Sequence, residues 1–211
     1  MSSTNNPTPV NYIMPEKHQR GMKARTKWCK PLREELTTIE RYNILAHKVF
    51  SKAADIELDN SQNRKTILQV VPVETEKWNA VREVIYLFVR NGRIMKIGGS
   101  RTGMKKRWGS YKCGHCVPER PMKNGQPYPG KMSVTNAHLY HTIEDDLLKG
   151  NTWEFWTWTL PTVSVTVDIM GTDTTVIAQT YHAYESRCME MFKTESGDMP
   201  QLCDNADPNY R

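Results

Sequence analysis

The chain has 211 residues, 38% of them hydrophobic, and a formal net charge of +6. That length suffices for one domain with a core and an appendage, and no apolar run approaches the roughly 18 residues of a membrane span. The start of the chain is polar and the five cysteines are scattered, so we expect a reduced, cytoplasmic protein with no membrane partner rather than a secreted, disulfide-linked one.

The positive charge is concentrated near the N-terminus. Residues 1–33 hold seven Lys and Arg side chains against one acid, Glu16, so this segment alone accounts for the net charge of +6. A basic arm of this kind is typical of proteins that bind a polyanion, most often nucleic acid. A solvated tail that keeps the protein soluble would have the same composition.

The first predicted element is a helix from Leu32 to about Ala54, because apolar residues recur there at spacings of three and four. Residues 58–65 are rich in turn-forming residues and are expected to be a connector. The stretch TILQVVPVE, residues 66–74, predicts a short strand, and residues 74–81 predict a helical turn.

The clearest unit is VIYLFVRNGRIMKIGGS, residues 84–100, in which Asn91-Gly92 separates two apolar runs. This pattern predicts a β-hairpin. The elements expected after it are a helix from Gly103 to Lys112, a proline-rich loop at 117–132, a helix from Ser133 or Thr135 to Leu148, a strand at 152–160, a second hairpin around Gly171, and a helix at 183–192.

A series of short motifs runs through residues 81–205 in a fixed order. They are Val84-Ile85-Tyr86 and Lys96-Ile97-Gly98 on the two strands of the hairpin, Arg107 and Tyr111 on the next helix, and finally Glu185, Phe192, Gly197, Pro200 and Asn205. In this order the motifs resemble the core of the GIY-YIG nuclease superfamily. The lysine form of the second motif resembles one branch of its type II restriction endonucleases, in which a cysteine and a glycine also follow the helix tyrosine, as Cys113 and Gly114 do here.

The sequence departs from the superfamily pattern at several positions. Val84 stands where the name motif has Gly, and Lys96 stands where it has its second Tyr. The last motif residue is either Asn205 or Asn209.

The resemblance implies an α+β fold. Its core is a short antiparallel sheet flanked by helices, here with an inserted β-hairpin and loop and with a basic, helical N-terminal extension. It divides the chain into that extension, residues 1–80, and a catalytic domain, residues 81–211.

The resemblance also implies the role of each site residue in phosphodiester hydrolysis. Tyr86 is the candidate general base, with its pKa lowered by neighbouring cations, and Lys96 orients the water or steadies the phosphate. Arg107 binds the scissile phosphate, because its planar guanidinium matches two phosphate oxygens. Tyr111 positions Tyr86, the water or the phosphate, and Glu185 holds one Mg²⁺ ion per active site.

This chemistry requires Tyr86 and Lys96 on one face of the hairpin. A two-residue loop would pair Arg90 with Arg93 and place the two side chains on opposite faces. A three-residue loop with Gly92 in the left-handed conformation would set Tyr86 opposite Lys96. We therefore predict the three-residue loop.

The implied partner is double-stranded DNA bound by a homodimer, because one site cuts one strand. The expected phosphate contacts come from Arg20, Lys23, Arg25 and Lys27. Candidates for a base contact, from the loops between residues 113 and 182, include Asn124, Gln126 and Asn136, which could equally serve as turn and cap residues. A repair or homing nuclease on the same core is an alternative.

Two cysteines offer a rival interpretation. Cys113-x-x-Cys116 and His138-x-x-His141 have the residue types of a structural Zn²⁺ site, although the gap between the pairs is longer than in common zinc fingers. The rival is a zinc-stapled DNA-binding protein without catalysis. A redox role fits less well, because the cysteine pair follows a helix instead of starting one.

Overall fold

The computed structural model describes residues 10–14, 29–32, 49–60, 66–116 and 134–203. The four predicted arm residues, the proline-rich loop and both candidates for the terminal asparagine lie outside these ranges.

A five-stranded sheet forms the centre of the molecule, and all of its neighbouring strands pair antiparallel. β3 is buried along its whole length, as expected for an apolar strand with neighbours on both sides. In sheet order the strands are β2 (Leu68–Pro72), β1 (Ser51–Leu58), β5 (Trp153–Thr159), β3 (Val84–Arg90) and β4 (Arg93–Ser100).

Strand β1 corrects the helix predicted to end near Ala54, because residues 51–54 belong to the sheet. Ala54 and Ile56 are buried while Asp55 between them is partly exposed, which is the period of a strand. At residues 51–54, pairing with β2 and β5 on the two sides of β1 overrides the helical spacing of the sequence, and residues 33–48 of the predicted helix lie outside the described ranges. β1 and β2 precede residue 81 and share one sheet with the later strands, and the division at residue 80 stays a prediction.

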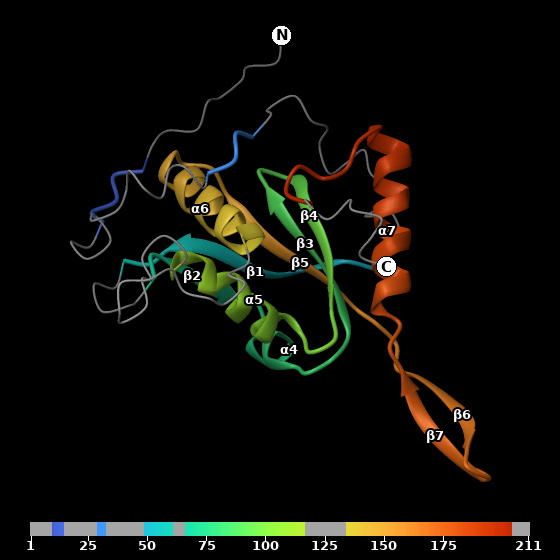
Figure 1. Cartoon of the computed structure of the whole chain (residues 1–211). Helices are drawn as coiled ribbons and strands as arrows, with labels where there is room; N and C mark the ends of the chain where they lie inside the picture. The colour runs from blue at the N-terminus through green and yellow to red at the C-terminus, as the bar shows by residue number, and fades with distance from the viewer. Residues whose placement is uncertain (1–9, 15–28, 33–48, 61–65, 117–133, 204–211) are drawn as a thin grey trace, which may run out of the picture.

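Helices cover both faces of the sheet (Figure 1). One face packs against α5 and α6 through a cluster that includes Tyr86, Phe88 and Phe155. The other face packs against α7 through a cluster that includes Ile85 and Leu87. The helices are α4 (Thr75–Asn79), α5 (Met104–Lys112), the short 3₁₀ helix η2 (Cys113–Cys116), α6 (Val134–Leu148) and α7 (Tyr181–Ser196).

The turn between β3 and β4 corrects the predicted three-residue loop. Asn91 and Gly92 have φ of 46° and 74°, and Arg90 pairs with Arg93, so the loop has two residues. A β-bulge at Met95 then shifts the register, and Lys96 lies opposite Phe88. Lys96 therefore shares a face with Tyr86, as expected. The cause is the extra residue in β4, whereas the prediction had placed the extra residue in the loop.

A second hairpin projects from the body of the protein (Figure 1). Its strands β6 (Val163–Ile169) and β7 (Thr172–Ala178) form a separate two-stranded sheet among the described residues, and they turn at Met170 and Gly171, with φ of 55° and 81°. The inserted hairpin expected from the sequence is thus confirmed.

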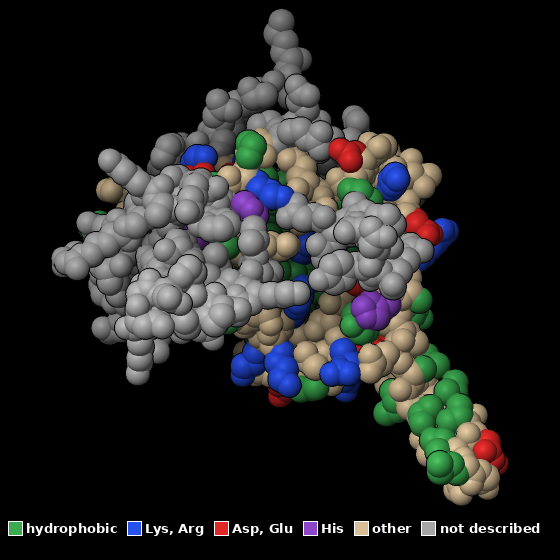
Figure 2. All heavy atoms as spheres, viewed as in Figure 1, with side chains coloured by type: hydrophobic (Ala, Val, Ile, Leu, Met, Phe, Trp, Pro, Cys, Tyr) green, Lys and Arg blue, Asp and Glu red, His purple; other side chains and the backbone are tan. Residues whose placement is uncertain are grey.

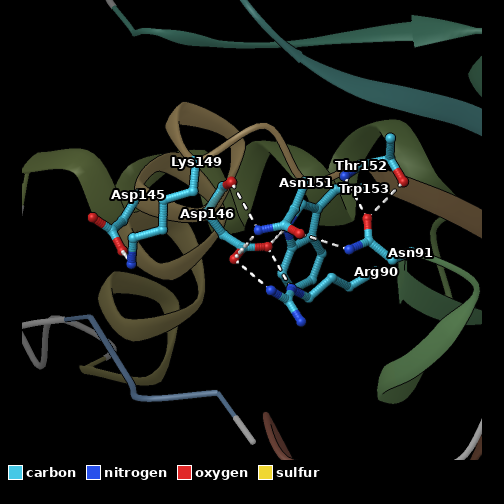
Figure 3. Close-up of polar contacts among 8 residues, drawn as sticks. All are labelled: Arg90, Asn91, Asp145, Asp146, Lys149, Asn151, Thr152 and Trp153. Carbon is cyan, nitrogen blue, oxygen red and sulfur yellow. Dashed lines mark hydrogen bonds and ion pairs between the residues drawn. The ribbon is translucent and has the colours of Figure 1, made fainter. Parts of the chain in front are cut away.

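A buried ion pair joins the end of β3 to α6 (Figure 3). Arg90 donates from Nε to Asp146 Oδ2 at 2.6 Å and from Nη2 to Oδ1 at 2.9 Å, and both side chains are buried. Trp153 Nε1 and Asn151 Nδ2 also donate to this carboxylate, at 2.7 and 2.8 Å. Asn91 donates in turn to Asn151 at 2.6 Å. The network fixes the C-terminal end of α6 to the β3–β4 turn.

We expect Asp146→Ala to lower the free energy of unfolding by about 3–5 kcal/mol, because it leaves the buried Arg90 without its partner. Asp145→Ala is a matched control on the same helix: Asp145 pairs with Lys149 at 2.6 Å at the surface, and its loss should cost less than about 1 kcal/mol. Urea denaturation measures both. Equal losses from the two variants would show that the Arg90 network does not hold α6.

Candidate active site

Two tyrosines and an arginine meet beneath strand β4. The hydroxyl oxygens of Tyr86 and Tyr111 lie 2.6 Å apart, and each side chain is 1% exposed. Arg107 donates from Nε to the Tyr86 oxygen and from Nη2 to the Tyr111 oxygen, both at 3.0 Å. Its Cζ atom lies 4.6 Å from the centre of the Tyr111 ring. The spacing of four residues between Arg107 and Tyr111 on α5 thus places both on the face that meets Tyr86.

Consecutive glycines in β4 make this arrangement possible. A Cβ atom at Gly98 would overlap with the ring and hydroxyl of Tyr86. A Cβ at Gly99, on the opposite face, would lie 2.5 Å from Tyr181 and 2.9 Å from Glu185 Oε2 on α7. Groups from both faces of the sheet can therefore approach the same stretch of β4, which is an edge strand.

Glu185 reaches that stretch from α7. Its carboxylate accepts a hydrogen bond from the backbone N–H of Gly99. Burial raises the pKa of Glu185 above its usual value, while that hydrogen bond and the charges of His182, Lys96 and Arg107 act in the opposite direction. The carboxylate is therefore partly desolvated and lies within electrostatic range of both predicted site cations.

Lys96 is held by the segment that follows α7. Its Nζ atom donates to the carbonyl of Leu202 at 3.0 Å, and the side chain is 7% exposed. The Leu202 N–H donates to the Met95 carbonyl at 2.9 Å, and the Ile97 N–H donates to Cys203 Sγ at 3.4 Å. Residues 202 and 203 thus cover the edge of β4 at its bulge and direct the lysine.

The pKa of Tyr86 differs from the expectation that nearby cations lower it. Burial raises this pKa well above its usual value, and the neighbouring Tyr111 raises it further. Arg107 and Lys96 lower it, as expected, but they do not outweigh the burial. Tyr86 is accordingly a protonated phenol at neutral pH in the protein without bound ligands.

The other predicted site residues divide into those the structure describes and those it does not. Asn136 lies near the start of α6, and its side-chain amide donates to the Ser110 carbonyl at 2.9 Å, which ties α6 to α5. Gly114 allows this close approach, because a Cβ there would overlap with the Asn136 carbonyl. A DNA contact by Asn136 stays a prediction, as do those of the basic arm.

Two places in the chain carry residue types that bind metals. Glu185 offers the oxygen ligand that Mg²⁺ prefers, and Mg²⁺ commonly binds with one or two carboxylates plus water and phosphate. At the predicted zinc residues, Cys113 is exposed, its thiol donates to the Gly109 carbonyl at 3.3 Å, and His141 is buried in α6. Within the described residues, no group of three or more His, Cys, Asp or Glu side chains converges as a metal site would.

Sequence reasoning missed three contributors to this site. Tyr181 packs on Gly99 and lies one helical turn before Glu185, but the helix was expected to begin at residue 183. Leu202 acts through its backbone carbonyl, which no side-chain pattern reveals. Cys203 adjoins β4 from a segment far along the chain.

Comparisons with known proteins give limited similarity. No protein-family model matches the chain, and no curated protein matches it significantly. The solved structure of restriction endonuclease HPY188I in complex with product DNA is similar, with a TM-score of 0.48 and 20% identity, over 92% of this chain and 99% of that one. A mutant of bacteriophage T4 EndoII has a TM-score of 0.45 and 16% identity, over 74% of this chain and 96% of that one. The function therefore has to be inferred from the geometry of the site.

Within the described part of the chain, no helix is both long and apolar enough to cross a bilayer.

We expect Gly98→Ala to displace Tyr86 from Arg107 and Tyr111, because the added methyl group occupies the position of the phenol. Overpacking of this kind costs about 1–3 kcal/mol of stability. Gly109→Ala in α5 is the matched control, since a Cβ there meets nothing within 4 Å and an alanine favours the helix. Thermal unfolding and the near-ultraviolet circular dichroism of the tyrosines measure the two effects. A Gly98→Ala protein with unchanged stability and tyrosine signal would contradict this packing.

Proposed function

We propose that this chain is a Mg²⁺-dependent, sequence-specific endonuclease that hydrolyses double-stranded DNA, a member of the GIY-YIG superfamily close to its small type II restriction endonucleases. The proposal rests on one observation. The side chains of Tyr86, Arg107 and Tyr111 are hydrogen-bonded to one another next to Gly98. Lys96 and Glu185 lie at the same edge of β4. These five residues come from four elements, of which β3, β4 and α5 follow one another in the chain and α7 lies about seventy residues further on.

Arg107 is suited to bind the scissile phosphate. Two of its N–H groups are engaged by the tyrosine oxygens, which fix the plane of the guanidinium, and its remaining N–H groups are available to phosphate oxygens. Arg101, Lys105 and Lys106 are exposed around the start of the same helix. Their positive charge would attract the DNA backbone and make binding weaker at high salt.

Tyr86 is the candidate base and Lys96 the candidate partner of the water or phosphate. To act as a general base, the Tyr86 phenol must first lose its own proton. Binding of a phosphate to Arg107 would not assist that loss. The rate should therefore follow the fraction of deprotonated Tyr86. Lys96, directed by the Leu202 carbonyl, lies beside the site and can interact with a phosphate oxygen.

Glu185 would hold the cation, since its partly buried carboxylate gains from a nearby positive charge. When bound, Mg²⁺ supplies charge that stabilises the developing negative charge on the leaving oxygen.

The first test is incubation of the protein with mixed duplex DNA, with Mg²⁺ and with EDTA. We expect discrete fragments that require Mg²⁺, and a loss of rate on the order of 10³ in Glu185→Ala. Glu190→Ala is the control on the same helix, because Glu190 is exposed and only pairs with Arg187 at 3.5 Å.

Cutting that is indifferent to Glu185 would refute the catalytic assignment. DNA binding without cutting, together with bound zinc that is lost in Cys113→Ser, would favour the zinc-stapled DNA-binding protein. Cutting restricted to nicked, branched or long asymmetric sites would favour a repair or homing nuclease.

The pH dependence of cleavage tests Tyr86. Because burial raises its pKa above the usual value, the deprotonated base grows rarer as pH falls, and the rate should rise about tenfold per pH unit from neutral pH into the alkaline range. Single-turnover rates at several pH values measure this. Tyr86→Phe should lose both the activity and the slope. A flat profile in the unmodified protein, or the same slope in Tyr86→Phe, would assign the base to another group.

A further inference from the structure

The projecting hairpin leaves the body of the protein and returns to it at one residue, Glu83, which directly precedes β3. The N–H of Leu160, just after β5, donates to the Glu83 carbonyl at 2.9 Å. At the other end of the hairpin, the Thr180 N–H and hydroxyl both donate to the Glu83 carboxylate, each at 3.0 Å. Glu83 therefore joins both ends of the hairpin to the central sheet.

The hairpin itself gives little support to α7, which directly follows it in the chain. Among the described residues it forms a sheet of its own, and Figure 2 shows it standing away from the body. Its residues Val165, Val167 and Ile169 are 43, 38 and 49% exposed. A two-stranded sheet of this kind is only marginally stable in water. The position of the first turn of α7 therefore depends on contacts with the body of the protein.

Glu83 makes such a contact at the N-terminus of α7. Thr180 is the N-cap residue, but its side chain makes no capping hydrogen bond to its own helix, and the first turn contains no acidic residue. A negative charge is favourable near the N-terminus of a helix, where the helix dipole is positive. Glu83 supplies that charge from another part of the chain, through hydrogen bonds that its carboxylate strengthens.

The start of α7 has a second point of attachment, at Gly99 in β4. Tyr181 and Glu185, one helical turn apart, both reach Gly99, and Glu185 accepts a hydrogen bond from its N–H. Gly99 pairs with Ile85, two residues after Glu83, so the two points of attachment lie roughly 7 Å apart along the strands. Two separate attachments fix the rotation of a helix about its axis, which a single attachment leaves free.

We propose that Glu83 is a positioning residue for Glu185. By holding Thr180, it sets the rotation of α7 that brings the Glu185 carboxylate to the edge of β4. The consequence for catalysis rests on the proposed function, because Glu185 affects cleavage only if it holds the cation. The consequence for the structure does not, so the two are measured separately.

Amide hydrogen exchange of the protein without Mg²⁺ or DNA measures the structural effect. In Glu83→Ala we expect the Gly99 N–H, which donates to Glu185, to exchange at least about tenfold faster. The Tyr184 N–H, which donates to the N-cap carbonyl, should change in the same way. The N–H of Cys188, in the buried middle of α7, should keep its exchange rate.

Glu83→Gln is the conservative variant. Its amide oxygen still accepts from Thr180, and its amide nitrogen replaces Oε1, which is buried and has no hydrogen-bond partner among the described residues. We expect exchange within about threefold of the unmodified protein. Arg82→Ala removes the neighbouring exposed side chain and should leave the exchange rates unchanged. Thermal unfolding checks each variant. If Glu83→Ala does not fold, Thr180→Val, which loses only the hydroxyl donor, replaces it with an expected threefold or so effect.

The Mg²⁺ dependence of cleavage measures the catalytic effect. In Glu83→Ala the half-saturating Mg²⁺ concentration should rise about threefold, because α7 holds Glu185 in place for a smaller fraction of the time. The rate at saturating Mg²⁺ should change less, since the carboxylate is still present. Glu83→Gln should restore the Mg²⁺ dependence of the unmodified protein.

Unchanged exchange of the Gly99 N–H in Glu83→Ala would overturn the proposal. So would a Glu83→Gln protein as impaired as Glu83→Ala, because the two hydrogen bonds from Thr180 would then not be the cause. Faster exchange in Glu83→Ala, in a protein whose unmodified form cleaves no DNA, would support the positioning of Glu185 and refute the proposed function.

Discussion

The site depends on one constraint, which is that β4 carries no side chains at Gly98 and Gly99. With no side chain on either face, the phenol of Tyr86 packs against one side and Glu185 approaches the other. The two groups would otherwise be separated by the thickness of the sheet and its side chains. β4 is an edge strand, so among the described strands only β3 pairs with it.

Two further contacts keep that edge in place. The bulge at Met95 turns Lys96 to the face of Tyr86, and Leu202 in the segment after α7 donates to the Met95 carbonyl and accepts from Lys96. On the far side of the hairpin, the Arg90 and Asp146 pair fixes α6, against which α5 packs. The site residues on α5 are thus positioned by a buried network that none of them belongs to.

Several elements of the fold and several residues of the candidate site could be predicted from the sequence. The Asn91-Gly92 turn, the helix with Arg107 and Tyr111, and the second hairpin follow from local patterns, and the order of the motifs brought together the residues that meet at β4. The bulge, the strand at residues 51–54 and the Leu202 carbonyl could not be predicted, because each depends on long-range pairing or on backbone groups. The raised pKa of Tyr86 was missed because burial is a property of the fold and not of the neighbouring charges.

A crystal structure of the Tyr86→Phe protein with Mg²⁺ and duplex DNA would show directly whether the β4 edge binds the DNA backbone. We expect a phosphate of the DNA backbone between Arg107 and Glu185, at the edge of β4 beside the two glycines, with the cation on Glu185. A duplex bound on another surface, with the Arg107 guanidinium distant from every phosphate, would contradict this expectation.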